Sequence, residues 1–218
     1  MPRSVTVALH KILPVSAKFP RQGTITALLH SLHMPTRSKS GTALLILDMI
    51  SEYRYPDANR IVRSARKAAL NIARLRERAH AAGMPVIYAN DTAGKWESDQ
   101  KDFVDRCMQP DSPGRKIVQL LAPTPQDYFI FKPRHSAFFG TPLHTLLQRL
   151  KIANLIATGI TSHQCVLFTA MDAHVREFKL IIPSDCIGAA AAADTRHALY
   201  IFSHALMAKV ASSRQLRL

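Results

Sequence analysis

The sequence lacks several features that would assign it at once to a common class of protein. No apolar run approaches the roughly 18 residues that a membrane span needs, so we expect no membrane-crossing segment. The three cysteines, Cys107, Cys165 and Cys186, are odd in number and form no Cys-x-x-Cys pair, the spacing of many metal and redox sites. We therefore expect reduced thiols in an intracellular protein, with the cytoplasm as its compartment.

Acidic residues are absent from the first 47 positions, which contain six Lys or Arg. Residues 1–41 also carry four prolines and show no clear periodicity, so we interpret them as a basic N-terminal extension with little order and no chemistry. A transit-type leader has such a composition, and organelle targeting is therefore an alternative location. Two other interpretations of this segment are equally open. It is either a flexible arm or a non-native extension from an upstream start, with Met34 as the natural beginning. Residues 42–218 are expected to form one domain.

Nucleic-acid motifs are also missing, although the formal net charge is +14. The basic residues after position 47 are scattered over helical patterns, with no zinc-finger spacing, no RNP-like aromatic motif and no long basic block. A moderately basic body can steer anionic substrates toward it. We expect a small-molecule substrate and do not expect a nucleic-acid partner.

What the sequence does contain is an alternation of short apolar runs and helical patterns. The runs are Thr42–Leu47, Pro85–Ala89, Tyr128–Phe131, Asn154–Thr158 and Lys179–Ile182. Helical patterns cover Asn59–Ala82, Ser98–Cys107, Ile117–Leu121, Pro142–Leu150, Cys165–Ala173 and Ala189–Lys209. Continuous apolar strands between helices are typical of a parallel sheet covered on both faces. The predicted class is a three-layer α/β/α fold with a mostly parallel central sheet.

Reactive side chains follow three of the predicted strands: Asp48, Lys132 and Cys165. The carboxyl ends of parallel strands meet at one edge of a sheet, where functional clefts form, so the three are candidates for one site. A thiolate attacks a carbonyl, a carboxylate shuttles the thiol proton, and a lysine cation holds both anions. Each residue also has an ordinary interpretation, as a helix cap, a solvated lysine or a small buried thiol.

The segment around Cys165 favours a nucleophile. Gly159 is expected to end the preceding strand, Ile160–Gln164 to form a compact turn, and Cys165–Ala173 to begin a helix. The unpaired N–H groups and the dipole at a helix N-terminus favour negative charge. We therefore expect a lowered pKa for the Cys165 thiol.

Three segments of the chain resemble the signature blocks of the isochorismatase-like cysteine hydrolases. They are TALLILDM at 42–49, KPRHSAFFGTPL at 132–143 and TGITSHQCVLFTAMDA at 158–173. That superfamily includes nicotinamidases, N-carbamoylsarcosine amidohydrolases and isochorismatases. The resemblance runs from about Thr42 to Lys209. It implies an isochorismatase-like fold with Rossmann-type topology.

The resemblance also implies a mechanism. Asp48, Lys132 and Cys165 fall on the catalytic triad of the family, and a cis peptide bond is expected between Ile160 and Thr161. That bond would turn the Thr161 N–H toward the substrate oxygen, where it forms an oxyanion hole with the Cys165 N–H. The implied reaction is hydrolysis of a small amide or imide C–N bond through a Cys165 thioester, without a cofactor. Family members commonly form dimers or tetramers, so a homo-oligomer is expected.

Departures from the family patterns bear on the substrate. Nicotinamidases carry a metal site made of an Asp-x-His pair and a further His. Between Asp48 and Lys132 this chain has only His80, inside a predicted helix, so we predict no metal site and doubt nicotinamide as the substrate. Two alternatives stay open: an isochorismate-type vinyl ether hydrolase, which several members achieve with glycine in place of Cys165, and a non-catalytic binding protein on the same fold.

Four further residues are candidates for the substrate pocket: Asp91, Trp96, Phe138 and His163. The first two have structural alternatives, a turn cap and an ordinary packed aromatic. His163 suggests a Cys–His dyad, but we expect it to line the pocket or to face a neighbouring subunit. Arg134 and His135 adjoin Lys132, where they either meet an anionic substrate group or are solvated.

Overall fold

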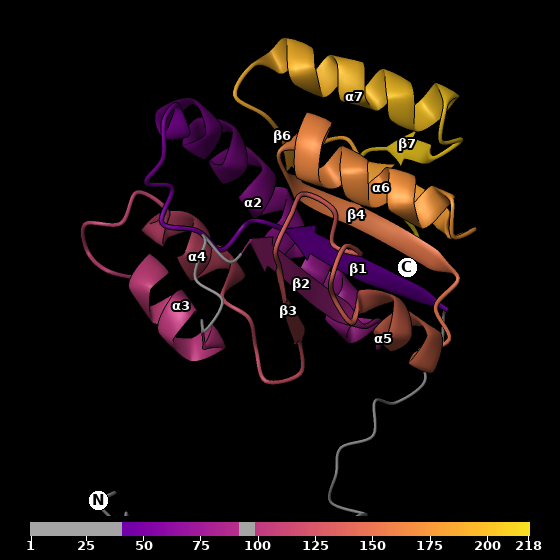
Figure 1. Ribbon diagram of the computed structural model, residues 1–218, viewed down its shortest axis with the longest axis horizontal. Helices are drawn as coiled ribbons and strands as arrows, with labels where there is room; N and C mark the ends of the chain where they lie inside the picture. The colour runs from indigo at the N-terminus through magenta and orange to yellow at the C-terminus, as the bar shows by residue number, and fades with distance from the viewer. Residues whose placement is uncertain (1–40, 92–98) are drawn as a thin grey trace, which may run out of the picture. The chain divides into compact units, whose positions relative to one another are not determined.

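The computed structural model describes residues 41–91 and 99–218, and these form a central sheet between two layers of helices (Figure 1). The strands are β1 (Thr42–Leu47), β2 (Val86–Asp91), β3 (Tyr128–Lys132), β4 (Asn154–Ile160), β5 (Lys179–Pro183), β6 (Ile187–Gly188) and β7 (Lys209–Ala211). The helices are α2 (Ala58–Ala81), α3 (Gln100–Cys107), α4 (Arg115–Leu121), α5 (Leu143–Arg149), α6 (Leu167–His174) and α7 (Ala192–His204). The predicted extension, residues 1–41, lies almost wholly outside the described residues and stays a prediction.

The described strands follow the order β3-β2-β1-β4-β5-β7, with β6 beside the end of β4. Each strand pair in this part of the chain is parallel. β1 lies in the middle, where Leu47 pairs with Ala89 of β2 on one side and Gly159 of β4 on the other. This arrangement confirms the predicted three-layer α/β class.

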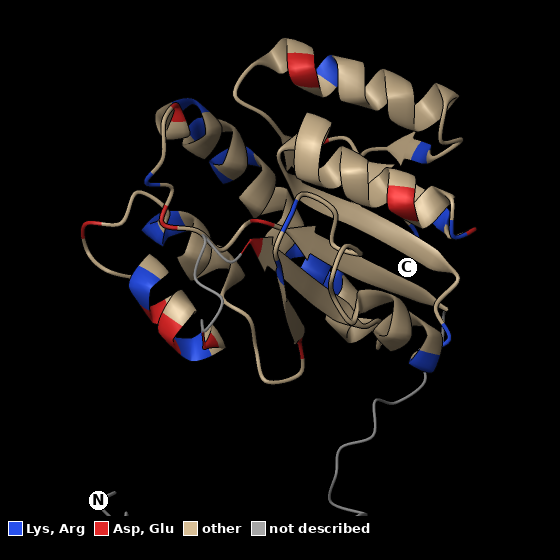
Figure 2. Cartoon of the chain, in the orientation of Figure 1, with Lys and Arg blue, Asp and Glu red and all other residues tan. Residues whose placement is uncertain are grey.

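The alternation of side chains along the strands divides the core into two layers. On one face Leu44 and Ile46 of β1 pack with α2, α3 and α4. On the other face Leu45 and Leu47 pack with α5, α6 and α7. Figure 2 shows that the charged residues lie mostly on the helices and loops, which leaves the strands uncharged along most of their length. None of the described helices is both long enough and apolar enough to span a membrane.

Gly159 does not end β4, as the sequence pattern suggested, because the strand continues to Ile160. The residue has a φ of 115°, and a Cβ atom there would lie 2.0 Å from the carbonyl oxygen of Leu47. Glycine is therefore required by the close approach of β4 to β1 rather than by a turn. The extra length carries the chain to the sheet edge where Asp48 lies.

Two other segments differ from their predicted structure. The turn and the helix start expected around Cys165 form instead a π-helical turn, Ser162–Val166, which continues directly into α6. The helix predicted over Ala189–Lys209 is shorter, and the chain after it forms β7, parallel to β5. A strand of three residues is too short to produce a readable alternation.

The loop between β1 and α2 is shaped by unusual backbone and by close packing. Asp48, Tyr53 and Asp57 all have positive φ, at 52°, 55° and 62°. A Cβ atom on Gly114, just before α4, would lie 1.9 Å from the Ser51 carbonyl oxygen, so only glycine lets this loop pack against α4. The loop is thereby held over the carboxyl end of β1.

Candidate active site

Asp48, Lys132 and Cys165 meet at the carboxyl edge of the sheet. The Lys132 Nζ atom lies 2.9 Å from Asp48 Oδ2 and 3.6 Å from Cys165 Sγ. Lys132 is fully buried, and the Asp48 side chain is 15% exposed. The three residues proposed as a triad are therefore brought together in one cluster, with the ammonium group between the carboxylate and the thiol.

Backbone contacts fix the acid and the cation. The Asp48 N–H donates to the Ala89 carbonyl, and the Asp91 N–H donates to Asp48 Oδ1 at 2.7 Å. Lys132 Nζ also donates to the Arg134 carbonyl at 3.1 Å. Because β1, β2 and β3 are neighbours in register, the sheet places Asp48, Asp91 and Lys132 next to one another.

Cys165 comes from the π-helical turn that follows β4. The peptide bond between Ile160 and Thr161 is cis, the position at which the family resemblance places one. The Thr161 carbonyl then accepts hydrogen bonds from the N–H groups of Gln164 and Val166. The turn therefore begins at the cis bond and places Cys165 within the first turn of a continuous helical segment.

The electrostatics of the thiol contradict the expected lowering of its pKa. Burial, followed by the negative charge of Asp48, raises the pKa of Cys165 to about 12, and the Lys132 cation only partly opposes this. Burial likewise raises the pKa of Asp48, against the opposing charge of Lys132. For Lys132, burial acts to lower the pKa, but the charges of Asp48 and Cys165 outweigh it and the pKa is raised. The resting thiol is thus neutral, and it lies beside the contact between Lys132 and Asp48.

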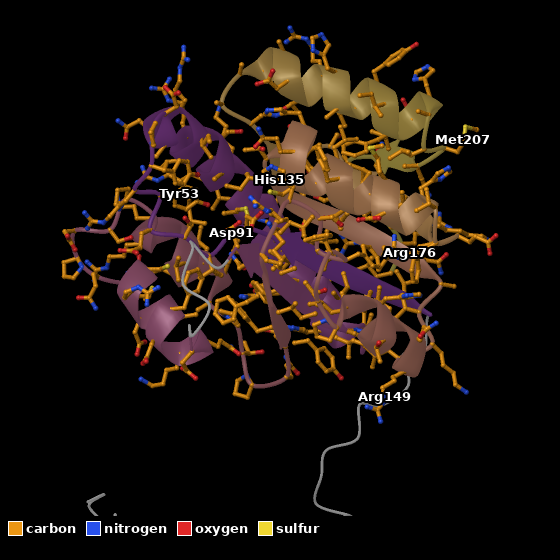
Figure 3. The ribbon with its side chains drawn as sticks, viewed as in Figure 1. Tyr53, Asp91, His135, Arg149, Arg176 and Met207 are labelled. Carbon is orange, nitrogen blue, oxygen red and sulfur yellow. The ribbon has the colours of Figure 1, made fainter. Side chains whose placement is uncertain are left out.

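A pocket of about 600 Å³ opens onto the thiol. Its walls come from the loop after β1, the end of β2, α2, α3, the segment after β3 and the turn before Cys165. The lining includes the apolar side chains of Ile50, Ile61 and Phe103. Figure 3 shows Tyr53, Asp91 and His135, all pocket-lining residues, at the same end of the sheet. The cluster therefore faces a space suited to a small molecule.

The four residues predicted to line the pocket differ in where they lie. Asp91 lines the pocket, and Trp96 lies outside the described residues. Phe138 does not line the pocket: it is 7% exposed in the opposite core layer, with its ring 5.9 Å from Phe178. The loop after β3 turns it toward α5, so its placement in the pocket wall was wrong. His163 also lies outside the lining of this pocket.

His135 takes the place near the thiol that a His163 dyad would have required. Its Nδ1 atom lies 3.9 Å from Cys165 Sγ, and its ring packs 5.4 Å from that of Phe168. The sequence shows His135 only as a neighbour of Lys132.

In residues 41–91 and 99–218, no group of three or more His, Cys, Asp or Glu side chains is placed to hold a metal ion. His80, the single histidine between Asp48 and Lys132, pairs through Nε2 with Asp127 Oδ1 at 2.7 Å. Metal independence nevertheless stays a prediction.

A parallel sheet, a pocket at its carboxyl edge and a thiol, a carboxylate and an ammonium group in contact define an α/β enzyme of hydrolytic type. Residues 42–215 match the family model described as the Isochorismatase domain, and the chain belongs to this family. It is an isochorismatase-family hydrolase.

Relatives of known sequence agree with this assignment. The chain is 38% identical over 179 residues to the uncharacterized isochorismatase family protein YaaI of Bacillus subtilis, which covers 82% of this chain and 98% of that protein. It is 35% identical over 127 residues to an N-carbamoylsarcosine amidase of Arthrobacter, covering 54% of this chain and 48% of the relative. It is also 31% identical over 120 residues to a probable isochorismatase of Pseudomonas chlororaphis, covering 54% and 58%.

Solved structures share the fold. An isochorismatase family protein from Desulfovibrio vulgaris superposes with a TM-score of 0.66 at 23% identity, covering 82% of this chain and 96% of that one. The N-carbamoylsarcosine amidase of Thermoplasma acidophilum gives a TM-score of 0.58 at 25% identity, covering 81% and 99%. A nicotinamidase from Staphylococcus aureus gives 0.61 at 21% identity, covering 78% and 97%.

Proposed function

We propose that this protein is a metal-independent cysteine hydrolase that cleaves a small amide or imide C–N bond through a thioester on Cys165. The observation that carries the proposal is the position of Lys132 Nζ, within 2.9 Å of Asp48 and 3.6 Å of the Cys165 sulfur. A buried cation in contact with both an acid and a thiol supports proton transfer between them.

The first half of the reaction forms the thioester. The Asp48 carboxylate removes the thiol proton as Cys165 Sγ attacks the substrate carbonyl, and the Lys132 cation stabilises the charge that develops on sulfur. The raised pKa of Asp48 makes its carboxylate a stronger base than an exposed aspartate. Asp48 then gives the proton to the departing nitrogen, and the C–N bond breaks.

The second half returns the enzyme to its starting state. Asp48, again ionised, takes a proton from a water molecule that attacks the thioester carbonyl. The acid product leaves as the proton returns to the Cys165 sulfur. The N–H groups of Thr161 and Cys165 are proposed to hold the carbonyl oxygen in both halves, as the family resemblance implies, and both residues line the pocket.

Vinyl ether hydrolysis of isochorismate is the second candidate. The similarity to a probable isochorismatase favours it, and such a reaction requires a proton donor but no nucleophilic thiol. Asp48, with its raised pKa, is a suitable donor. The two candidates therefore differ in their need for Cys165.

The test uses ammonia release from a panel of primary amides and imides, and pyruvate release from isochorismate. Wild type is compared with Cys165→Ala and with Cys186→Ala as a matched control, because Cys186 is a buried thiol outside the pocket. Ammonia release that Cys165→Ala loses and Cys186→Ala keeps is expected. Pyruvate release that persists in Cys165→Ala would move the protein to ether hydrolysis. Turnover that survives added chelator is expected in either case, and its loss would overturn metal independence.

A further inference from the structure

Asn90 is a buried polar residue in the wall of the same pocket as Cys165. It is the fifth residue of β2, is 1% exposed and lines the pocket together with Ile50 and Phe103. Few polar side chains in a protein interior remain without a partner. The hydrogen bonds of Asn90 therefore indicate what the pocket is built to hold.

Among the described residues, only one end of the Asn90 carboxamide has a hydrogen-bond partner. Its Nδ2 group donates to the Ile50 carbonyl at 2.7 Å, whereas its Oδ1 atom is buried and has no hydrogen-bond partner among the described residues. Exchanging the two ends would place oxygen against the Ile50 carbonyl oxygen, so the donor bond fixes the orientation. An unpaired carbonyl oxygen carries the cost of its lost hydration. A ligand that supplies a donor removes that cost.

Asn90 lines the same pocket as Asp48 and Cys165. The N–H of the next residue, Asp91, donates to Asp48 Oδ1 at 2.7 Å. Apolar neighbours Ile50, Ile61 and Phe103 share the pocket wall, so a hydrogen bond formed there is shielded from water. A substrate in this pocket has its reacting carbonyl at Cys165, and an N–H near that carbonyl is a donor that an acceptor in the same pocket suits.

We propose that Asn90 is a specificity-determining residue whose Oδ1 atom accepts a hydrogen bond from an N–H group of the substrate. The substrate is then an amide or urea that retains an N–H near its reacting carbonyl, and analogues without that donor are rejected. The inference rests on the proposed amide hydrolysis. A role limited to fastening the Ile50 loop would explain the Nδ2 bond and leave Oδ1 unexplained.

The test compares one amide with the methyl ester of the same acyl group. The pair is benzamide and methyl benzoate, or, where another amide of the panel is hydrolysed faster, that amide and its methyl ester. The quantity measured is the ratio of kcat/KM for the amide to kcat/KM for the ester. Intrinsic reactivity cancels when the ratio is compared between enzymes, and general damage to the fold lowers both rates together.

Asn90→Leu removes the acceptor at similar size, and Asn71→Leu is the matched control. Asn71 also donates through Nδ2 to a backbone carbonyl, that of Asp185, but it lies outside the pocket lining. The amide-to-ester ratio is expected to fall about tenfold in Asn90→Leu and to stay unchanged in Asn71→Leu. Circular dichroism checks folding, and Asn90→Ala, which adds no bulk, replaces Asn90→Leu if that variant does not fold.

Each outcome decides the matter. A fall in the ratio confined to the Asn90 variant supports the proposal. Equal losses on amide and ester overturn it, because Asn90 then only fastens the loop, while amide hydrolysis by the wild type still supports the proposed function. A wild type that hydrolyses no amide of the panel overturns the proposed function, and the role of Asn90 falls with it.

Discussion

Two regions of the described structure place a thiol beside an aspartate, and we propose chemistry for only one of them. Cys186 Sγ lies 3.8 Å from Asp185 Oδ1, and burial raises the pKa of Cys186 to about 12, as it does for Cys165. The thiol pKa therefore does not distinguish the two. The difference lies in the groups around each carboxylate.

Asp185 is held by hydroxyl and backbone donors. It accepts hydrogen bonds from the Ser213 N–H and from the side chains of Ser212 and Ser213. Burial acts to raise the pKa of Asp185, but these hydrogen bonds outweigh it and lower the pKa. Asp48 has the opposite shift, a Lys132 cation that also reaches the thiol, and a pocket in front of it. The proposed catalytic pair thus differs from Asp185 and Cys186 in its shared cation and in its access to a pocket.

The largest expected effect is the difference in activity between variants that lack one or the other thiol. Cys165→Ala should lower kcat/KM for the amide by on the order of 10⁴-fold or more, since covalent catalysis is lost. Cys186→Ala should keep nearly full activity and lose only packing stability. Steady-state kinetics and thermal denaturation of the two variants measure this. Similar losses in both would mean that the Cys165 thiol has no special role.

The second effect removes the shared cation. Lys132→Met should lower kcat/KM by on the order of 10³-fold, because the thiolate and the acid lose their counter-charge. It should also lower the free energy of unfolding by about 3 kcal/mol, since breaking a buried ion pair leaves Asp48 without its partner. Urea denaturation checks the stability and amide turnover checks the rate. Lys179→Met, which changes an exposed lysine, should do neither.

The third effect uses the opposite pKa shifts of the two aspartates. The pKa of Asp48 is raised above 3.8, so its base form, and with it kcat/KM, is lost as the pH falls through that raised value. The ionised Asp48 favours the unfolded state, so the stability it contributes is complete below 3.8 and declines as the pH rises through the raised value.

Asp185, with a pKa below 3.8, contributes stability above 3.8 that is lost as the pH falls through its own lowered value. Activity should therefore disappear, reversibly, at a pH where circular dichroism still reports a native fold. If unfolding and inactivation coincide on the acid side, the assignment of the acid limb to Asp48 is wrong.

The smallest expected effect concerns His135. Its Nδ1 atom is 3.9 Å from Cys165 Sγ and the side chain is exposed, so we expect His135→Ala to lower kcat/KM by less than about tenfold. His204→Ala is a matched control, because that exposed histidine also packs on an aromatic ring, that of Tyr200. A loss above a hundredfold in kcat for His135→Ala alone would place His135 among the catalytic groups.

Much of the site could be predicted because the ends of the strands can be read from the apolar runs in the sequence. Apolar runs that stop at Asp48, Lys132 and near Cys165 locate three side chains at one sheet edge, and the structure brings them together. The burial of these side chains could not be predicted from the sequence in this way. The helix N-terminus suggested a lowered thiol pKa, but desolvation and the neighbouring Asp48 have the larger effect.

The direction of side chains in loops could not be predicted from the sequence either. Phe138 and His135 lie in one short loop, and nothing in the sequence tells which of them turns to the pocket. Likewise, Gly159 suggested the end of a strand. In the structure glycine is required at this position because a Cβ atom would lie 2.0 Å from the Leu47 carbonyl oxygen. The Asn90 oxygen, which has no partner among the described residues, could not be predicted either, because its surroundings depend on the position of the loop after β1.

The most direct test of the account is rapid-quench mass spectrometry of the enzyme during turnover of an amide that it hydrolyses. The account predicts a transient mass increase equal to the acyl group, located on the peptide that contains Cys165, in wild type and in Cys186→Ala alike. Amide hydrolysis that proceeds at the wild-type rate in Cys165→Ala, or an acyl group found on another residue, would contradict it.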